Sequence, residues 1–536
     1  MSWSGFPVDA EQVRVARALA QRIAAEVLRF ISSHTTVSIE RTVLRALGFD
    51  SVGARATPVA NLVVDELLRR GLLGAGAASW LAQVMSRTDQ TPREICARIA
   101  MSGLHAGLFS PVEQGGADKA RDAVSELTAR AALELGARAE QRDALKGELG
   151  VGPRPGVGPR PEVGPRPLKY VIVATGDIHD DVLQAVAAAQ AGADIIAVIR
   201  STAQSLLDYV PKGATREGFG GTYATQENFR IMREALDQES QRLGRYIGLT
   251  NYSSGLCMPE IALMGAIERL DYLLNDAMYG ILFRDINMKR TFVDQYFSRR
   301  ICALARIGIM TGEDNYLTTA PALTAFHTVV ASQFINEAFA RPAGLPPSLI
   351  GLGHAFQIDP AVDDSLLLEL GQALLVRTLF PDSPIKYMPP TKHMPGDIFM
   401  GYLLDGMFNL VGVASGQSVQ LLGMHTESIH NPFLMDRFLS LKNADYVFCA
   451  ARSLGQEVRW APDGKVVRRA REVLELAVAL LEQVAQKGLM TAISEGLFAD
   501  VKRSPDGGKG LGGVVARGEG YFNPLLDQLE GRGDPR

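Results

Sequence analysis

A group of charged, hydroxyl and aromatic side chains in the middle of this 536-residue chain could together hold a flat, anionic ligand. Arginine binds phosphate through two parallel hydrogen bonds and a hydroxyl adds a donor, so Arg200 and Ser205 could bind a phosphate group. Tyr279 offers a ring face for stacking, and Ser254 supplies a neutral hydroxyl. The remaining candidates suit a second anion or the charged groups of an amino acid: Arg284, Asp314, Lys386 and Glu427.

These side chains lie close to short apolar runs that alternate with longer helical stretches between about residues 169 and 450. The runs are Tyr170–Thr175, Ile195–Ile199, Tyr246–Leu249, Gly280–Phe283, Arg306–Met310, Ser348–Gly353, Ile385–Met388 and Val419–Met424. Eight strands close a (β/α)8 TIM barrel, in which the active site lies at the carboxyl ends of the strands. We therefore expect the candidates to meet at one barrel mouth.

The segments on either side of this barrel differ from it in pattern. Residues 1–150 predict a helical region, with apolar residues at helical spacing in Val13–Leu28. Residues 151–167 repeat Val-Gly-Pro-Arg-Pro three times, which indicates an extended linker because proline disrupts helices and sheets. The barrel then occupies 168–455. A small extension, 456–536, contains a helix at Val466–Lys487 and a glycine-rich loop.

The composition is that of a globular protein, with 47% hydrophobic and 21% charged residues. A net charge of -4 without a long Lys/Arg run favours neither a nucleic-acid partner nor an anionic membrane. We find no secretory signal and no apolar run of the ~18–20 residues that span a bilayer. The four cysteines are scattered, which suits a reducing compartment. We expect a cytoplasmic protein.

Three motifs match known ligand-binding signatures incompletely. The loop around Lys509 resembles a phosphate loop, but Gly510 replaces the Ser or Thr and no strand precedes it. Gly218–Gly221 lacks the strand-turn-helix context of a dinucleotide fingerprint. Asp177–His179 resembles the start of a cobalamin signature, but Val182 occupies its glycine position. We therefore expect no nucleotide binding at the loop around Lys509, and we interpret Gly218–Gly221 as a barrel loop and His179 as a polar residue at the rim of the pocket.

The segment His425–His430 contains two imidazoles and a carboxylate, but its spacing differs from His-Glu-x-x-His and no thiolate cluster accompanies it. We therefore predict no metal site, and interpret Glu427 as a hydrogen-bonding carboxylate that faces a ligand. No Gly-x-Ser-x-Gly elbow is present, so a hydrolase triad has no support.

Four longer segments are specific enough to indicate a family. From Lys169 to about Ala450 the chain closely resembles the alpha subunit of lysine 5,6-aminomutase, above all in residues 213–233, 246–260, 276–287 and 423–430. The flanks match more loosely, and the Val-Gly-Pro-Arg-Pro repeat resembles an insertion. The resemblance implies a radical isomerase that uses adenosylcobalamin and pyridoxal 5'-phosphate. Such enzymes move the terminal amino group of D-lysine or L-β-lysine from C6 to C5.

The resemblance also implies roles for the residues that would bind pyridoxal phosphate. Arg200 and Ser205 would hold its phosphate, and Ser254 would form a hydrogen bond with its pyridine nitrogen. A neutral hydroxyl leaves that nitrogen largely unprotonated, as suits radical chemistry that needs no strong electron sink. Tyr279 would stack on the ring as a catalytic residue. Arg284 would bind an anionic group of the cofactor–substrate adduct.

Other residues would bind the substrate. Asp314 and Lys386 would hold the amino and carboxylate ends of the lysine, together with Arg284. Glu427 would be a second catalytic residue, near the substrate or the adenosyl group.

A partner subunit is implied too. In the family, a small beta subunit carries the cobalamin-binding Rossmann domain and the lysine that forms an imine with pyridoxal phosphate, which predicts an α2β2 assembly. Lys386 and Lys392 are alternative imine lysines within this chain, but the family pattern argues against both. Two other readings stay open. One is an ornithine 4,5-aminomutase-like large subunit, which would carry the cobalamin domain itself. The other is a non-catalytic barrel that only scaffolds a partner.

Overall fold

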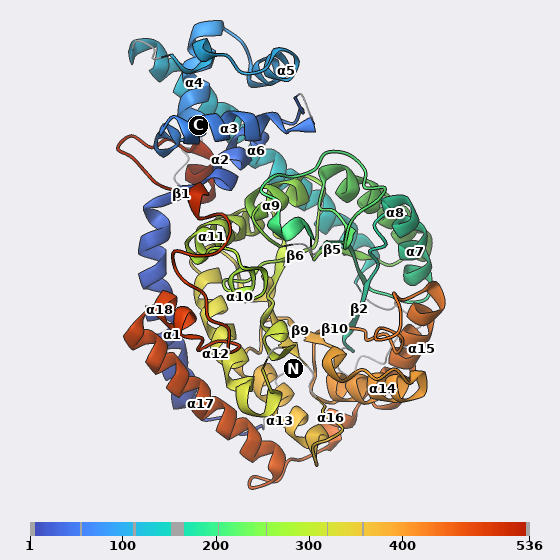
Figure 1. Ribbon diagram of the computed structural model, residues 1–536. Coiled ribbons are helices and arrows are strands. Elements are labelled where there is room, and N and C mark those ends of the chain that lie inside the picture. The colour runs from blue at the N-terminus through green and yellow to red at the C-terminus, as the bar shows by residue number, and fades with distance from the viewer. Residues whose placement is uncertain are drawn as a thin grey trace.

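The computed structural model describes residues 6–53, 56–110, 114–151, 166–201, 203–252, 254–318, 320–355 and 358–531. Eight parallel strands in these residues form a closed barrel in the order β2-β10-β9-β8-β7-β6-β5-β3, with β2 also paired to β3 (Figure 1). The expected α/β TIM barrel is thus confirmed. The strands are β2 (Leu168–Ile172), β3 (Ile195–Ser201), β5 (Gly248–Asn251), β6 (Tyr272–Leu274), β7 (Gly308–Met310), β8 (Ile350–Ala355), β9 (Ile385–Met388) and β10 (Val419–Leu421).

Helices surround the barrel on its outside (Figure 1). A two-residue strand, β4 (Gly221–Thr222), lies in the loop that follows β3 and pairs antiparallel with β3. The surrounding helices are α7 (Ile178–Gln190), α8 (Gln226–Leu243), α9 (Met258–Ile267), α11 (Met288–Leu304), α12 (Ala322–Ala340), α13 (Ser365–Leu379), α14 (Ile398–Ala414) and α15 (Leu434–Ala450).

The predicted fourth strand is wrong. Gly280–Phe283 lies in a short helix, α10 (Tyr279–Arg284), and the fourth barrel strand is β6, at Tyr272–Leu274. A four-residue apolar run has no periodicity that separates a strand from a buried helical turn. The helical turn is favoured here because the Asp276 carboxylate accepts hydrogen bonds from the Met278 and Tyr279 backbone N–H groups, which begin the helix.

Side chains fill the interior of the barrel. Tyr170 on β2, Ile195 on β3 and Met310 on β7 belong to one buried apolar cluster. Because β7 lies across the barrel from β2 and β3, such a cluster can form only inside the barrel. The barrel is therefore a packed core, and room for a ligand must come from the loops at one end.

Segments from both flanks pack together against one side of the barrel. Helix α1 (Ala10–Ser32), which contains the predicted Val13–Leu28 helix, packs against α12 and α17 (Lys465–Lys487). Helix α17 matches the predicted helix Val466–Lys487 and also packs against α13. The linker at 151–167 falls mostly on residues 152–165, outside the described residues.

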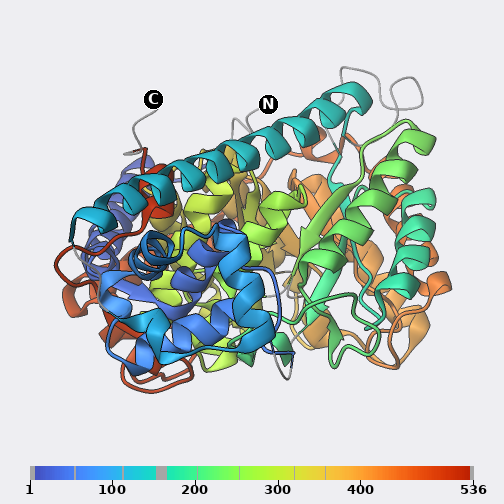
Figure 2. The same cartoon turned by 90° about the horizontal axis from the view of Figure 1, so that it is seen from above.

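The remaining N-terminal helices form a second group beside the barrel (Figure 1). The long helix α6 (Gln114–Leu149) packs against α4 (Ala77–Thr88), α9 and α19 (Pro524–Leu529) and runs along one side of the molecule (Figure 2). Strand β1 (His34–Thr36) pairs antiparallel with β11 (Val514–Ala516), which joins the two flanks directly. The other α-helices are α2 (Val37–Ala46), α3 (Val59–Arg69), α5 (Pro92–Ser102), α16 (Leu454–Glu457) and α18 (Leu489–Glu495).

Among the described residues, no single helix has the length and apolar character to cross a membrane. Only α17 and α18 taken together, bent by 112°, reach that length and composition.

Candidate active site

Lys386 and Asp314 form a buried ion pair at the mouth of the barrel. Lys386 Nζ lies 3.1 Å from Asp314 Oδ2, and both side chains are fully buried. Asp314 follows β7 and Lys386 lies on β9, so the carboxylate reaches across β8. Gly353 on β8 makes this possible, because a Cβ atom there would lie 2.7 Å from Asp314 Oδ1. The structure thus brings together two predicted residues from strands that are not neighbours.

The geometry of this pair determines the protonation state of Lys386. Burial alone would lower the pKa of the Lys386 ammonium, but the Asp314 carboxylate outweighs burial and holds that pKa above its usual range. The Lys386 Nζ atom also lies 5.1 Å from the centre of the Tyr252 ring, which approaches from the opposite side of the mouth. Lys386 is therefore protonated at neutral pH.

Tyr279 and Arg284 lie together on α10. Arg284 Nη2 donates a hydrogen bond of 2.7 Å to Tyr279 Oη, and its guanidinium carbon lies 5.2 Å from the ring centre. Burial raises the pKa of Tyr279 to about 12, although Arg284 opposes this rise. Arg284 Nε is buried without a hydrogen-bond partner among the described residues. The arginine therefore has a donor left for an anion.

Ser205 and Ser254 lie next to each other because of a glycine. A Cβ atom at Gly255 would lie 2.3 Å from the Ser205 carbonyl oxygen, so only glycine permits this approach. Leu256 N–H donates to the same carbonyl at 3.1 Å. Gln295 Nε2 donates to Ser254 Oγ at 3.4 Å, and both serines are buried. The backbones that carry the two predicted serines are thus brought together.

Arg200 lies on β3, where its backbone is paired with Thr222 of β4. Its side chain lies outside the described residues, so the predicted phosphate contact stays a prediction.

Glu427 lies half-buried in the loop after β10, beside a second carboxyl group that the sequence did not single out. Asp405 on α14 is buried, and neither of its carboxylate oxygens has a hydrogen-bond partner among the described residues. Burial, and then the nearby Glu427 carboxylate, hold the pKa of Asp405 well above its usual range. Gly423 makes room for it, because a Cβ atom there would lie 2.1 Å from Asp405 Oδ1.

The two histidines near Glu427 face one carboxylate. His425 Nε2 and His430 Nδ1 lie 3.8 and 3.9 Å from the two oxygens of Asp436. Burial lowers the pKa of His425. In the described part of the chain, no group of three or more His, Cys, Asp or Glu side chains is arranged to hold a metal ion.

The incomplete motifs have structural explanations. Asp177 caps α7 by accepting the His179 backbone N–H at 2.8 Å, which accounts for the Asp-x-His spacing. Gly218 N–H donates to the Gly176 carbonyl within the loops beside β4. Lys509 exchanges backbone hydrogen bonds with Asp285 and Asn287, so its glycine-rich loop supports the segment after α10.

Other residues of the mouth were missed as candidates. Tyr252, which faces Lys386, stands in the predicted segment 246–260, but its aromatic ring gives no signal of its own. Glu313 directly precedes Asp314, and Asp276 stands three residues before Tyr279. Both are fully buried charged residues beside predicted site residues. Their charge and their positions next to predicted site residues could have identified Glu313 and Asp276 from the sequence.

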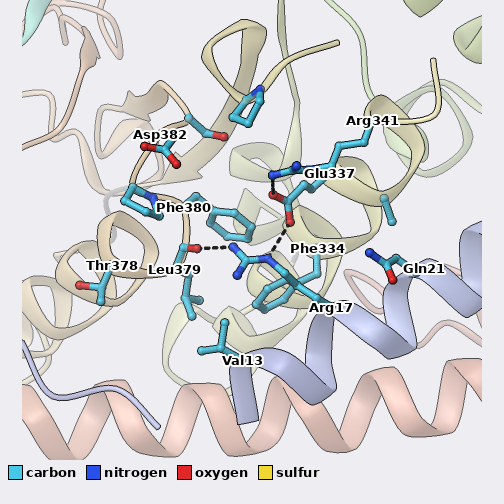
Figure 3. A pocket seen from close by; sticks show the side chains of 14 residues that line it. Val13, Arg17, Gln21, Phe334, Glu337, Arg341, Thr378, Leu379, Phe380 and Asp382 are labelled. Carbon is cyan, nitrogen blue, oxygen red and sulfur yellow. Dashed lines mark hydrogen bonds and ion pairs between the residues drawn. The ribbon is translucent and has the colours of Figure 1, made fainter. Parts of the chain in front are cut away.

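A separate cavity of about 420 Å³ lies at the other end of the barrel, and Figure 3 shows the side chains that line it. It is lined by the C-terminal turns of α12 and α13, which lead into β8 and β9, and by α1. Arg17 in this cavity is already engaged, since it bonds to Glu337 and to the Leu379 carbonyl oxygen. The cavity therefore reflects how α1 packs against the barrel.

The fold and the site define a TIM-barrel enzyme with polar residues gathered at the carboxyl ends of its strands. Residues 6–528 match the family described as the D-lysine 5,6-aminomutase TIM-barrel domain of the alpha subunit. The chain is 50% identical over 526 residues to the lysine 5,6-aminomutase alpha subunit of Acetoanaerobium sticklandii, with 98% of each chain covered. It is 49% identical over 519 residues to that of Fusobacterium nucleatum, with 97% of this chain and 98% of the relative covered.

The chain therefore belongs to the lysine 5,6-aminomutase alpha-subunit family. It is an aminomutase subunit, hence part of an isomerase, and the family names imply a partner subunit. A more distant relative is the D-ornithine 4,5-aminomutase subunit beta of A. sticklandii, 28% identical over 366 residues. That match covers 66% of this chain and 49% of the relative.

Proposed function

We propose that this chain is the catalytic alpha subunit of an adenosylcobalamin- and pyridoxal phosphate-dependent lysine 5,6-aminomutase. It would move the terminal amino group of D-lysine or L-β-lysine from C6 to C5. The observation that carries the proposal is the buried Lys386–Asp314 pair, which lies at the same mouth as Tyr279, Arg284 and Ser254. Relatives about 50% identical over nearly the whole chain bear the aminomutase name.

The residues present fit pyridoxal phosphate. Its phosphate needs several donors, its ring needs a flat face, and its ring nitrogen needs one polar partner. Ser205 and Arg200 would bind the phosphate, where the glycine at 255 keeps the loop backbones close together. Tyr279 would stack on the ring, and the unpartnered Nε of Arg284 would bind an anionic oxygen. When bound, the two cofactors supply the radical and the electronic delocalisation for the migration.

Ser254 is oriented for its role by a neighbour. Its Oγ accepts a hydrogen bond from Gln295 Nε2, so the serine's own proton is free to point away from the glutamine. The hydroxyl would then donate to the ring nitrogen. This arrangement would keep the ring nitrogen hydrogen-bonded without a full positive charge.

The Lys386–Asp314 pair suits the zwitterionic end of an amino acid. The substrate ammonium would bind Asp314 and its carboxylate would bind Lys386. Each protein charge then exchanges one ionic partner for another, so the large cost of leaving a buried charge unpaired is avoided. The pair thereby places the reacting end of the chain at a fixed distance and helps to exclude water.

Neither nearby lysine is suited to bind pyridoxal phosphate covalently, since that reaction requires an amine that is neither held as an ammonium by a carboxylate nor engaged with other groups. Lys386 is held as an ammonium by Asp314. Lys392 Nζ donates to the Leu317 and Ala320 carbonyl oxygens, both at 3.3 Å. This supports a lysine on a small beta subunit, which would also carry the cobalamin-binding Rossmann domain. We propose an α2β2 assembly in the cytoplasm.

The test uses the complex of this chain with its beta partner, both cofactors and D-lysine or L-β-lysine. We expect turnover of lysine, and weaker cofactor binding in Ser254→Ala and Tyr279→Ala, by roughly 1–3 kcal/mol each. Ser298→Ala is a matched control, because Ser298 is also buried but donates to the Asp294 carbonyl within α11. Unchanged cofactor binding in both site variants would remove these residues from the site.

Borohydride reduction gives a second test. The isolated chain should incorporate no pyridoxal phosphate at Lys386 or Lys392, whereas the complex should be labelled on the beta partner. Labelling of either residue in this chain would contradict the assignment.

An ornithine substrate is the second candidate, since a D-ornithine 4,5-aminomutase subunit is a distant relative. The higher identity and fuller coverage of the lysine relatives favour lysine. A scaffold without catalysis has no need for the buried pair or for the two adjacent serines.

A further inference from the structure

Asp276 lies just past the end of β6 and connects several parts of the mouth. Its Oδ1 atom accepts hydrogen bonds from the backbone N–H groups of Met278, at 2.7 Å, and Tyr279, at 2.8 Å. Its Oδ2 atom accepts from Gly312 N–H, at 2.9 Å, and from Asn336 Nδ2, at 3.1 Å. One buried carboxylate therefore holds the start of α10, the loop after β7 and helix α12.

The network continues behind Asp276 through buried side chains. Asn336 Nδ2 also donates to Glu313 Oε1 at 2.7 Å, and Arg299 Nη2 donates to Asn336 Oδ1 at 2.6 Å. Glu313 Oε2 accepts the Gly353 backbone N–H at 3.2 Å. Burial, and then the Asp276 charge, raise the pKa of Glu313 to about 8.

The network lies directly behind the two groups that would bind cofactor and substrate. The Tyr279 ring rests on the loop after β7, since a Cβ atom at Gly312 would lie 2.9 Å from Tyr279 Cδ2. Asp314 follows two residues later in the same loop. Because Asp276 accepts hydrogen bonds from the backbone of both Tyr279 and Gly312, it fixes the Tyr279 ring relative to the Asp314 carboxylate.

We propose that Asp276 is a positioning residue that sets the distance between the Tyr279 ring and the Asp314–Lys386 pair. The inference rests on the proposed function, because it assumes that Tyr279 stacks on the cofactor and Asp314 binds the substrate. Radical migration needs the adduct and the substrate end held together, and a displacement of about 1 Å can cost about a hundredfold in rate. A carboxylate that accepts five hydrogen bonds, the fifth from the Tyr316 hydroxyl, is a rigid way to prevent such a displacement.

Asp276→Asn is the test, because an amide has one acceptor oxygen and one donor nitrogen. Whichever way the amide is oriented, its –NH2 group faces the backbone N–H donors of either α10 or the loop after β7. That element then loses its hydrogen bonds to residue 276. Asp271→Asn is the matched control. Asp271 is also buried and accepts Leu249 N–H and Arg233, but it stands at the opposite end of β6.

The measurements are made on the complex with the beta partner. They are the pyridoxal phosphate Kd from its absorbance, kcat and KM for lysine, and the Tm. We expect both substitutions to lower the Tm. Only Asp276→Asn should also weaken cofactor binding and reduce lysine kcat/KM, by about 10- to 100-fold, with an altered cofactor spectrum. If Asp276→Asn instead follows Asp271→Asn, with a lower Tm alone, Asp276 has no positioning role.

The wild-type complex and a second variant separate a failure of this inference from a failure of the proposed function or of folding. Failure of the wild-type complex to bind pyridoxal phosphate or to turn over lysine would refute the proposed function, whereas failure of this inference leaves the wild type active. If Asp276→Asn does not fold, Tyr316→Phe removes a single donor, the hydroxyl 3.3 Å from Asp276 Oδ1. That variant should raise the cofactor Kd and the lysine KM about two- to tenfold. No change in either constant would overturn the inference.

Discussion

Replacing Lys386 by methionine removes the charge at the barrel mouth and keeps most of the side-chain volume. Lys386 Nζ and Asp314 Oδ2 are 3.1 Å apart and both side chains are fully buried. Leaving one partner of such a pair alone costs roughly 3–5 kcal/mol. Burial already raises the pKa of Asp314, so the carboxyl can take up a proton in the variant. We therefore expect the free energy of unfolding of Lys386→Met to fall by about 3 kcal/mol, near the lower limit of this range.

The loss of stability in Lys386→Met should increase with pH. A carboxyl whose folded pKa lies above its unfolded value binds more protons in the folded state, so stability falls as pH rises between the two pKa values. In Lys386→Met, no ammonium group lowers the pKa of Asp314, so burial raises that pKa further above its unfolded value. The stability deficit against the wild type should therefore be larger at pH 8 than at pH 5, as measured by urea unfolding of the complex.

Two further variants separate stability from substrate binding. Lys386→Met combined with Asp314→Asn removes both charges and should recover much of the lost stability, yet remain inactive with lysine. Lys169→Met is the control, because Lys169 is a buried lysine on β2 that pairs with Asp445 away from the mouth. It should lower stability and leave the lysine KM unchanged.

The comparison of substrates completes the test. If Lys386 anchors the lysine carboxylate, a chain that is one methylene shorter cannot reach the radical while both ends are held. Ornithine should then lose rate more than affinity in the wild type, by about a hundredfold. Lys386→Met should reduce lysine turnover far more than ornithine turnover. Equal losses for both substrates would refute the role of Lys386 as the anchor.

Three other changes have defined outcomes. Tyr279→Phe keeps the ring but removes the hydroxyl bonded to Arg284, so cofactor affinity should fall by about 1 kcal/mol in a spectral titration, less than in Tyr279→Ala. Glu313→Gln should stabilise the protein increasingly from pH 5 to pH 8 in thermal unfolding, by at most roughly 5 kcal/mol, because the folded pKa of about 8 lies above the unfolded value. Gly423→Ala should lower the Tm, since its Cβ would overlap Asp405; an unchanged Tm would show that this carboxyl can move.

The barrel could be predicted because seven of its eight strands are apolar runs of clear strand character. The exception is instructive. Strand β6 comprises only Tyr272–Leu274, too short for a pattern, while the apolar run Gly280–Phe283 nearby is helical. The helical conformation depends on hydrogen bonds that the Met278 and Tyr279 backbone N–H groups donate to Asp276, and propensity alone does not show them. The pairing of β1 with β11 could not be predicted either, since nothing local links His34 to Ala516.

For the site, the sequence predicts where residues stand but not which residues they meet. Asp314 and Lys386 were both expected at strand ends, whereas their mutual ion pair depends on Gly353 in the strand between them. The adjacency of Ser205 and Ser254 likewise depends on Gly255. Asp405 could not be identified as a site residue from the sequence, because a single acidic residue in an apolar helix is expected to face solvent.

The pairing of β1 with β11 also affects the timing of folding during synthesis. His34–Thr36 pairs with Val514–Ala516, so this strand waits for about 480 residues to be translated before its partner exists. At roughly 5–20 residues per second, the delay is about half a minute to a minute and a half. The barrel between them can form during that interval, but the N-terminal helices cannot be joined to the C-terminal segment until it ends. Chaperones that cover exposed strands therefore have their longest opportunity at His34–Thr36.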